Sequence, residues 1–143
     1  MATTNIYLLF KGNCEEAFNF YKSAFGVEFD YLSRFCDIPS GEKRKVSAAY
    51  KNQIMHVSLP IGNSFLMGSD CGEKFEPRFV QGNNFSVSVT AATKDEADIL
   101  FNRLAEGGVI TMPLTNTFWG DYFGMLTDKF DVNWMVGFNE KQQ

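Results

Sequence analysis

The sequence carries the same helix-start pattern in its two halves. The segments Asn13-Cys14-Glu15-Glu16-Ala17 and Thr93-Lys94-Asp95-Glu96-Ala97 each place a capping side chain three residues before a glutamate. In this pairing the cap accepts from the third backbone N–H of the helix, and the glutamate reaches back to the N–H of the cap. Apolar residues follow at helical spacing, and Gly26 and Gly107-Gly108 mark the ends. The pattern predicts two helices, each of which buries one face.

Short strand-like runs surround both predicted helices. They are Ile6 to Phe10, Val27 to Phe35, Ile54 to Ile61 and Phe65 to Ser69 in the first half, and Phe85 to Val89, Val109 to Leu114, Tyr122 to Leu126 and Val132 to Phe138 in the second. Gly62-Asn63 predicts a tight hairpin. The order of one strand, one helix and three strands occurs twice, so we expect an α+β fold with each helix on one face of an antiparallel-rich sheet. Residues 37–53 predict an exposed loop that can include a helical turn over Val46 to Tyr50.

Length and charge narrow the class of protein. A chain of 143 residues predicts a single domain, which we divide into module one over about 1–72 and module two over about 80–140. The net charge of -4 argues against a nucleic-acid partner, and the short cationic run Lys43-Arg44-Lys45 predicts a solvated loop. No apolar stretch approaches the ~20 residues of a membrane span, and the first residues lack a secretory pattern. We therefore expect a soluble, cytoplasmic protein that binds neither nucleic acid nor membrane.

The cysteines predict neither a disulfide framework nor a zinc site. Cys14, Cys36 and Cys71 are odd in number and show no CxxC spacing, and the chain has a single histidine. We expect three free, buried or half-buried thiols.

Strand alternation predicts which side chains face away from the helices. In the second half Phe85, Val87 and Val89 should face the helix, and Asn84, Ser86 and Ser88 the opposite side. In the first half one face should hold Met55, Val57, Leu59 and Ile61, and the other Ile54, His56, Ser58 and Pro60. If the two halves curl into a half-barrel, this second face becomes the wall of a cup suited to a small molecule. The alternative is a sheet face that is simply exposed to solvent.

Several segments, taken in order, resemble one known family. They are Glu15-Glu16-Ala17-Phe18-Asn19-Phe20-Tyr21 with Phe25-Gly26, Ile54-Met55-His56, Leu66-Met67-Gly68-Ser69-Asp70, Phe118 to Gly124 and Asp128 to Trp134. Together they resemble the PhnB-like branch of the glyoxalase/bleomycin-resistance/dioxygenase superfamily over nearly the whole chain. The resemblance implies two βαβββ modules that form a cupped, half-barrel, antiparallel-rich mixed sheet. It also implies a homodimer that binds a small molecule.

The same resemblance places metal ligands at positions where this chain has other residues. Metal-using members carry His or Glu on the first and last strands of each half. Here the first strand offers Asn5 and Tyr7, the second half begins with Asn84 and Ser86, and Met135 stands at the position of the last ligand. A thioether is a poor ligand for a hard divalent cation. We therefore expect no metal at the usual site and no other cofactor, with a divalent ion at a non-standard site as the alternative.

A few side chains remain as candidates for chemistry. His56, the only histidine, is either a hydrogen-bonded structural residue or an acid or base, and Asp70 is either its partner or a turn carboxylate. Trp119 lies in a glycine-containing loop beside Asp121 and can close over a ligand, whereas Trp134 alternates with valines and should be core.

Three functional hypotheses follow. The first is a metal-free protein that binds a small aromatic or cationic molecule. Its candidate ligand-binding residues come from the strand alternation, from the loop of Trp119 and from the family resemblance: Ser58, Asn84, Ser86, Ser88, Trp119 and Met135. The second is a lyase, isomerase or transferase with His56, Asp70 and Asp121 as catalytic residues, with or without a divalent metal. The third is a structural or regulatory partner whose cup is vestigial. Some relatives carry a ubiquinone-methyltransferase label, but the sequence has no glycine-rich cofactor turn after a strand, so we set that activity aside.

Overall fold

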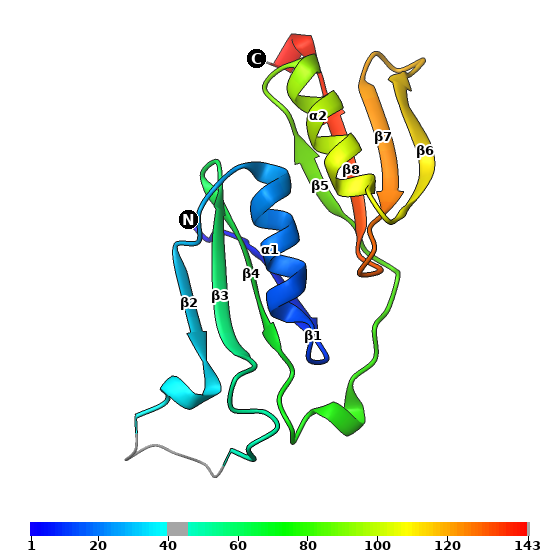
Figure 1. The fold of residues 1–143 in the computed structure, drawn as a ribbon. Helices are drawn as coiled ribbons and strands as arrows, with labels where there is room; N and C mark the ends of the chain where they lie inside the picture. Colours follow the sequence, from blue (N-terminus) through cyan, green and yellow to red (C-terminus); the bar gives the residue numbers. More distant parts are fainter. Residues whose placement is uncertain (40–45, 143) are drawn as a thin grey trace. The chain divides into compact units, whose positions relative to one another are not determined.

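The computed structural model of the protein describes residues 1–39 and 46–142. The chain forms two compact units, Met1–Val80 and Gln81–Gln143. Each unit consists of one α-helix on one four-stranded sheet (Figure 1). The predicted solvated run Lys43-Arg44-Lys45 lies outside the described residues.

The first unit is a βαβββ module. Its elements are β1 (Ile6–Phe10), α1 (Cys14–Phe25), β2 (Tyr31–Arg34), β3 (Ile54–Ile61) and β4 (Ser64–Asp70), with short 3-10 helices η1 (Phe35–Asp37) and η3 (Glu76–Arg78). The strand order is β1-β4-β3-β2. Strand β1 runs parallel to β4, and the remaining neighbours are antiparallel. The predicted hairpin at Gly62-Asn63 is confirmed, whereas the strand predicted from Val27 begins only at Tyr31.

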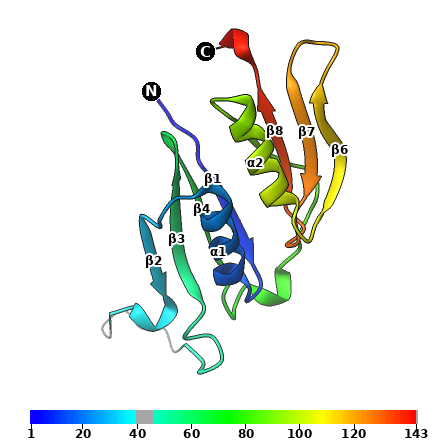
Figure 2. The ribbon, with the colours of Figure 1, turned by 45° about the horizontal axis from the view of Figure 1, so that its top comes forward.

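The second unit repeats this order. Its elements are β5 (Val87–Thr90), α2 (Lys94–Ala105), β6 (Val109–Asn116), β7 (Tyr122–Thr127), β8 (Asn133–Phe138) and the 3-10 helix η4 (Glu140–Gln142). The strand order is β5-β8-β7-β6, and β5 is parallel to β8 (Figure 1). Figure 2 shows β8, β7 and β6 in this order. The predicted α+β fold of two βαβββ modules is confirmed.

Each helix packs a phenylalanine against a glycine of its own sheet. A Cβ atom added at Gly68 of β4 would lie 2.8 Å from Cε2 of Phe18, and one added at Gly124 of β7 would lie 2.9 Å from Cε2 of Phe101. Both phenylalanines are buried. The missing side chain at each glycine therefore lets the helix approach the sheet closely enough to close the core.

The two helix starts are capped in different ways. At α2 the predicted capping bond of Thr93 is confirmed, because its Oγ1 accepts from the backbone N–H of Glu96 at 3.0 Å. At α1 the prediction is wrong, because the side chain of Asn13 makes no capping hydrogen bond. The carboxylate of Asp70, at the end of β4, accepts instead from the backbone N–H of Cys14 at 3.0 Å. A carboxylate supplied by a distant strand has replaced the local cap.

The predicted strand faces hold with two exceptions. The register of β2 against β3 shifts between Ser33 and Arg34, so that Met55 is skipped in the pairing. This bulge turns Ile54 away from the face of His56, and Ile54 is fully buried. Phe85, expected to face α2 from within a strand, precedes β5 and is exposed.

The segment after η1 has the helical turn that the sequence allowed. The backbone N–H of Tyr50 donates to the carbonyl of Ser47 at 2.9 Å, and that of Gln53 donates to the carbonyl of Tyr50 at 3.0 Å. All three cysteines are free, although Cys36 is exposed rather than buried. Within residues 1–39 and 46–142, the structure contains no helix that is both long and apolar enough to cross a bilayer.

Candidate functional site

The first sheet presents a polar and aromatic face on the side away from α1. The strand register brings Tyr7, Met67, Ser58 and Tyr31 into one row across β1, β4, β3 and β2. The next row contains Leu9, Ser69, His56 and Ser33. We call the surface formed by Tyr7, Tyr31, Ser33, His56, Ser58, Met67 and Ser69 the His56 face.

Two tyrosine rings flank His56 on this face. The ring centroid of Tyr7 lies 5.7 Å from that of His56, with the planes 29° apart, and the centroid of Tyr31 lies at 5.8 Å. Both tyrosines are exposed, whereas His56 is half-buried between them. Tyr7 and Tyr31 come from the two edge strands, so their rings stand as aromatic walls on either side of the histidine.

A hydrogen bond joins the imidazole of His56 to Tyr7. The hydroxyl of Tyr7 lies 3.3 Å from Nδ1 of His56. If the hydroxyl donates, the neutral ring carries its proton on Nε2 and can present it to a ligand as a donor. Nε2 has no hydrogen-bond partner among the residues that the structure describes.

Buried serine hydroxyls lie next to the histidine. Ser33, Ser58 and Ser69 are all buried, which is unusual for so polar a residue. Ser33 is 5% exposed, and its Oγ is buried and has no hydrogen-bond partner in the described structure. Ser33 is the register partner of His56. An unpaired, buried hydroxyl beside a half-buried imidazole is the kind of polar group that a bound molecule can satisfy.

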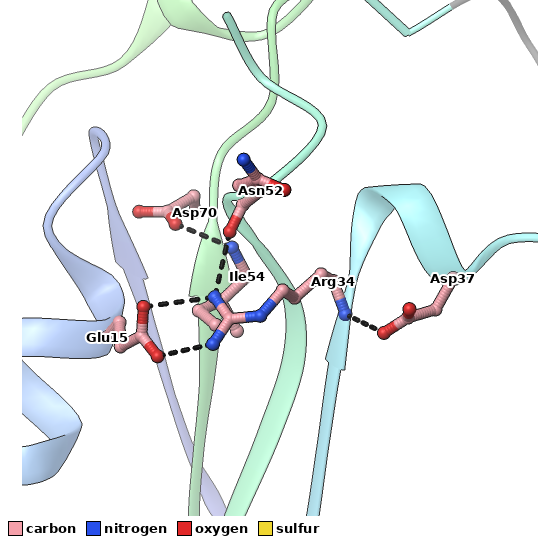
Figure 3. A network of polar contacts seen from close by, with 6 residues as sticks. All are labelled: Glu15, Arg34, Asp37, Asn52, Ile54 and Asp70. Atoms are coloured by element: carbon pink, nitrogen blue, oxygen red, sulfur yellow. Dashed lines mark hydrogen bonds and ion pairs between the residues drawn. The ribbon is translucent and has the colours of Figure 1, made fainter. Parts of the chain in front are cut away.

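Asp70 is not brought to His56. By alternation along β4 it shares the α1 side with Leu66 and Gly68. Its two oxygens accept from three backbone N–H groups, those of Gly12 at 2.9 Å, Cys14 at 3.0 Å and Ile54 at 2.9 Å, the last of which is drawn in Figure 3. The carboxylate therefore joins the start of α1 to β3 and β4.

A salt bridge lies beside this carboxylate. The guanidinium of Arg34, at the end of β2, donates to both carboxylate oxygens of Glu15, at 3.0 and 2.5 Å, and also to the carbonyl of Asn52 at 2.9 Å (Figure 3). The hydrogen bonds from Arg34 lower the pKa of the Glu15 carboxyl. Together with Asp70, this pair fastens the ends of β2 and β3 to α1 and so holds the strands that carry His56 and Ser33.

The corresponding face of the second sheet is dominated by methionine. The register places Ser88, Met135, Met125 and Met112 in one row across β5, β8, β7 and β6. Ser88 and Asn84 are exposed, and Ser86 is half-buried. Met135 is half-buried in this row. The second unit thus offers a softer, less polar surface than the His56 face does.

Trp119 and Asp121 meet in the turn between β6 and β7. Nε1 of Trp119 donates to Oδ2 of Asp121 at 2.9 Å, and Nδ2 of Asn139 donates to Oδ1 of the same carboxylate. The indole is half exposed and packs edge-on against Phe118 and Phe123. Asp121 therefore holds the orientation of Trp119, and both belong to the second unit.

Trp134 is core, as predicted. It is fully buried on the α2 side of β8, and its Nε1 donates to Oδ2 of Asp128 at 2.8 Å. Asp128 also accepts from the backbone N–H groups of Phe130 and Val132, at 2.7 and 3.1 Å. This buried carboxylate closes the turn between β7 and β8.

Sequence reasoning found His56 and Ser58 but missed Tyr7, Tyr31 and Ser33 as members of the same face. In the sequence, Tyr7 marks only a position where a metal ligand is missing. Ser33 and Tyr31 alternate along one strand, as Ser58 and His56 do, and that period was the signal available. The pairing partner of each strand was not available from the alternation.

The donors on the His56 face do not fit a divalent metal. They are one imidazole, two phenols, serine hydroxyls and the thioether of Met67, and the imidazole nitrogen Nδ1 is already bonded to Tyr7. In the described part of the chain, no three His, Cys, Asp or Glu side chains gather in a group that could hold a metal ion. A hard cation needs several carboxylate, carbonyl or imidazole ligands, which this face does not supply.

Comparison with known proteins identifies relatives that match along the whole chain. A crystal structure of protein PA1353 from Pseudomonas aeruginosa is 38% identical, covers 97% of this chain and 98% of its own, and superposes with a TM-score of 0.78. The PhnB protein from Bacillus cereus, described as a putative 3-demethylubiquinone-9 3-methyltransferase, is 30% identical, covers 96% of this chain and 99% of its own, and has a TM-score of 0.73. Protein YjdN from Escherichia coli strain K12 is 29% identical over 142 residues, or 95% of each chain.

A more distant structure extends the relationship at the level of the fold. The glyoxalase/bleomycin resistance/dioxygenase family enzyme from Burkholderia phytofirmans is 15% identical and covers 94% of this chain and 95% of its own, with a TM-score of 0.62. The family model described as 3-demethylubiquinone-9 3-methyltransferase matches residues 2–137. The chain therefore belongs to that family, as a PhnB-like member, and shares the fold of the glyoxalase/bleomycin resistance/dioxygenase family enzyme.

Proposed function

We propose that the protein binds a small organic molecule on the His56 face, without a metal or other cofactor. The observation that carries this proposal is the buried hydroxyl of Ser33, which has no hydrogen-bond partner and lies beside His56. A buried polar group without a partner costs about 1–3 kcal/mol. A polar atom of a bound ligand that reaches the buried Ser33 hydroxyl can remove that cost, and Nε2 of His56 supplies a second donor in the tautomer in which Tyr7 donates to Nδ1.

The two tyrosine rings define the class of ligand. Tyr7 and Tyr31 flank the imidazole at 5.7 and 5.8 Å, so a planar or cationic group on this face would contact π-systems on both sides. The net charge of -4 favours a cation over an anion at long range. The proposed ligand is therefore a small aromatic or cationic molecule with at least one polar atom for Ser33.

Methyl transfer, the activity in the description of the family, is not proposed here. A nucleotide-type cofactor would use a glycine-rich turn and the free N–H groups at a helix start. In this chain the β1–α1 turn has only Gly12, and the N–H groups of Gly12 and Cys14 already donate to Asp70. The same bonds count against the catalytic set of His56, Asp70 and Asp121, because the carboxylate of Asp70 is engaged by backbone donors.

We further propose a cytoplasmic homodimer. Three free cysteines suit a reducing compartment. Strand β1 is at the edge of its sheet, and an edge strand offers backbone N–H and C=O groups that can pair with a second copy of the chain. Sedimentation equilibrium of the purified chain tests the dimer, and a monomer at micromolar concentration would contradict it. Asn84, Ser86, Ser88, Trp119 and Met135 remain predicted ligand-binding residues of the second unit.

A thermal melt tests binding and the role of metals together. The chelator-treated protein is melted alone, with Ni²⁺, Zn²⁺, Mn²⁺ or Co²⁺, and with a library of small aromatic and cationic compounds. A compound at a hundredfold excess over its dissociation constant adds about 2.7 kcal/mol, which raises Tm by several degrees. We expect such shifts with compounds and none with metals.

Two variants make the melt specific. His56→Ala should abolish the compound shift, whereas Asn63→Ala, in the exposed β3–β4 turn, should retain it. A metal-induced shift that is lost in His56→Ala would overturn the metal-free proposal. A compound shift that persists in His56→Ala would move the site away from the His56 face.

A further inference from the structure

We propose that the first unit carries a second binding site, separate from the His56 face, for an organic anion with an apolar body. The site is a pocket of about 490 Å³, within the range of small-molecule sites. We call it the Arg78 pocket. Its lining residues come from η1, the turn before β3 and the segment from β4 to η3: Phe35, Ile38, Val46, Tyr50, Cys71, Gly72, Glu73, Lys74, Phe75 and Arg78.

The walls of the Arg78 pocket are largely apolar and aromatic. Phe35, Tyr50 and Phe75 contribute three rings, and Ile38 and Val46 contribute aliphatic side chains. Gly72 lies beside one of these rings, because a Cβ there would be in ordinary van der Waals contact, at 3.6 Å, with Cζ of Phe35. The bare glycine and the phenylalanine ring thus meet at the wall of the pocket, which suits the flat body of a ligand.

The acidic groups at the pocket already have hydroxyl donors. Oγ of Ser47 lies 2.9 and 2.8 Å from the two carboxylate oxygens of Glu73. The hydroxyl of Tyr50 is hydrogen-bonded to Glu76, which raises the pKa of Tyr50. These bonds hold Ser47 and Tyr50 against the segment after β4 and keep one side of the pocket in place.

The basic groups, in contrast, have no acidic partner. Neither Lys74 nor Arg78 takes part in an ion pair within the described residues. The guanidinium of Arg78 lies 5.1 Å from the ring centroid of Phe75, a cation–π contact that orients its planar set of donors. Because Glu73 and Glu76 already accept from Ser47 and Tyr50, the guanidinium of Arg78 is the group that favours an anion, and it can bind a carboxylate, sulfonate or phosphate with two parallel hydrogen bonds.

Two fluorescent probes test this site by their charge. 8-Anilinonaphthalene-1-sulfonate has an aromatic body and an anionic group, and N-phenyl-1-naphthylamine has the same body without the charge. We expect Arg78→Gln to weaken the sulfonate about tenfold, as the loss of a charge-assisted bond does, and to leave the neutral probe unchanged. Arg103→Gln, an exposed arginine on α2, should change neither.

A third variant tests the shape of the pocket and separates it from the His56 face. Ile38→Trp should fill the pocket and reduce the binding of both probes, with Tm and near-ultraviolet circular dichroism confirming a native fold. His56→Ala should leave the affinity of the sulfonate unchanged, because the anion is assigned to the Arg78 pocket and not to the His56 face. The proposal is overturned if the sulfonate binds Arg78→Gln or Ile38→Trp as tightly as wild type, or if His56→Ala abolishes its binding.

Cysteine reactivity provides an independent readout. Cys71 lines the pocket and is half-buried, and its burial raises the pKa of the thiol, whereas Cys36 is exposed and serves as an internal reference. The sulfonate probe should slow alkylation of Cys71 by N-ethylmaleimide and leave that of Cys36 unchanged. Equal rates at Cys71 with and without saturating probe would overturn the assignment to the Arg78 pocket.

Discussion

The carboxylate of Asp70 accepts the backbone N–H of Cys14 at 3.0 Å, across 56 positions of sequence. The same carboxylate also accepts hydrogen bonds from the backbone N–H groups of Gly12 and Ile54. One buried side chain therefore joins the β1–α1 turn, α1 and β3 to the end of β4. This arrangement makes a local cap at Asn13 unnecessary. It also explains why Asp70 is buried on the side of α1 rather than paired with His56.

Loss of the Asp70 carboxylate should destabilise the first unit strongly. Asp70→Ala leaves three backbone N–H groups without their charged acceptor, and hydrogen bonds to charged groups contribute about 1.5–3 kcal/mol each. We expect the free energy of unfolding in urea to fall by at least about 3 kcal/mol. The matched control, Asp30→Ala, removes an exposed carboxylate and should change the free energy of unfolding by less than about 0.5 kcal/mol. Equal effects of the two substitutions would contradict the role of Asp70.

The close approach of α1 to its sheet predicts a steric effect at Gly68. In Gly68→Ala the new methyl carbon would lie 2.8 Å from the carbonyl oxygen of Leu8 and 2.8 Å from the ring of Phe18. Overpacking of this kind costs about 1–3 kcal/mol. At Gly82 an added Cβ meets only the side chain of Asn84, at 3.7 Å, so Gly82→Ala should be nearly neutral. Urea unfolding of both variants makes the comparison, and a neutral Gly68→Ala would contradict the packing described.

The Glu15–Arg34 salt bridge predicts a stability difference that depends on pH. Arg34 lowers the pKa of Glu15 below its ordinary 4.5, so the pair stabilises the folded state at pH values above 4.5. The contribution is lost as pH falls through the lowered folded-state pKa. Because both side chains are partly exposed, at 46% and 31%, solvent screening limits it to about 1 kcal/mol or less.

The variant Glu15→Gln isolates this contribution. Its free energy of unfolding should lie below that of the wild type at pH 7, and the two should converge at pH 3. In 1 M NaCl the difference at pH 7 should shrink, because salt screens a partly exposed pair. A difference that grows on acidification would have the wrong sign for this interaction.

The unpaired hydroxyl of Ser33 predicts opposite effects on stability and on binding. Ser33→Ala removes a buried polar group that has no partner, so the free protein should keep or gain stability, by up to about 1 kcal/mol. A ligand found by the melt should bind this variant about tenfold more weakly, since it loses a hydrogen bond to Ser33. Calorimetric titration measures the affinity. An unchanged affinity would remove Ser33 from the site.

Much of the fold could be predicted from the sequence because its local signals agree. The Thr93–Glu96 cap, the glycine at the end of α1 and the alternation in β3 each depend on residues close in sequence, and the structure confirms them. The cap of α1 was not predictable in this way, since Asp70 reaches it through the pairing of β4 with β1. Ile54 was misplaced because a bulge shifts the register by one residue.

The candidate site could be predicted only in part, for the same physical reason. Alternation put His56 and Ser58 on one face, but the strands that bring Tyr7 and Tyr31 to His56 are paired by tertiary contacts. The orphaned hydroxyl of Ser33 depends on burial, which a local pattern does not report. The Arg78 pocket is built from three segments, one of which lies in residues 37–53, a stretch that the sequence predicts as an exposed loop without indicating its tertiary contacts.

The single histidine permits a direct measurement of the central claim. With any affinity tag removed, the Cε1–H resonance in a proton NMR spectrum belongs to His56 alone. Small aromatic and cationic compounds are titrated into the chelator-treated protein, and Asn63→Ala and Tyr31→Ala are titrated in parallel. The account predicts a saturable shift of this resonance in wild type and in Asn63→Ala, without added metal, and a much weaker one in Tyr31→Ala. Compounds that bind without moving the His56 resonance, or that move it only after a divalent metal is added, would contradict it.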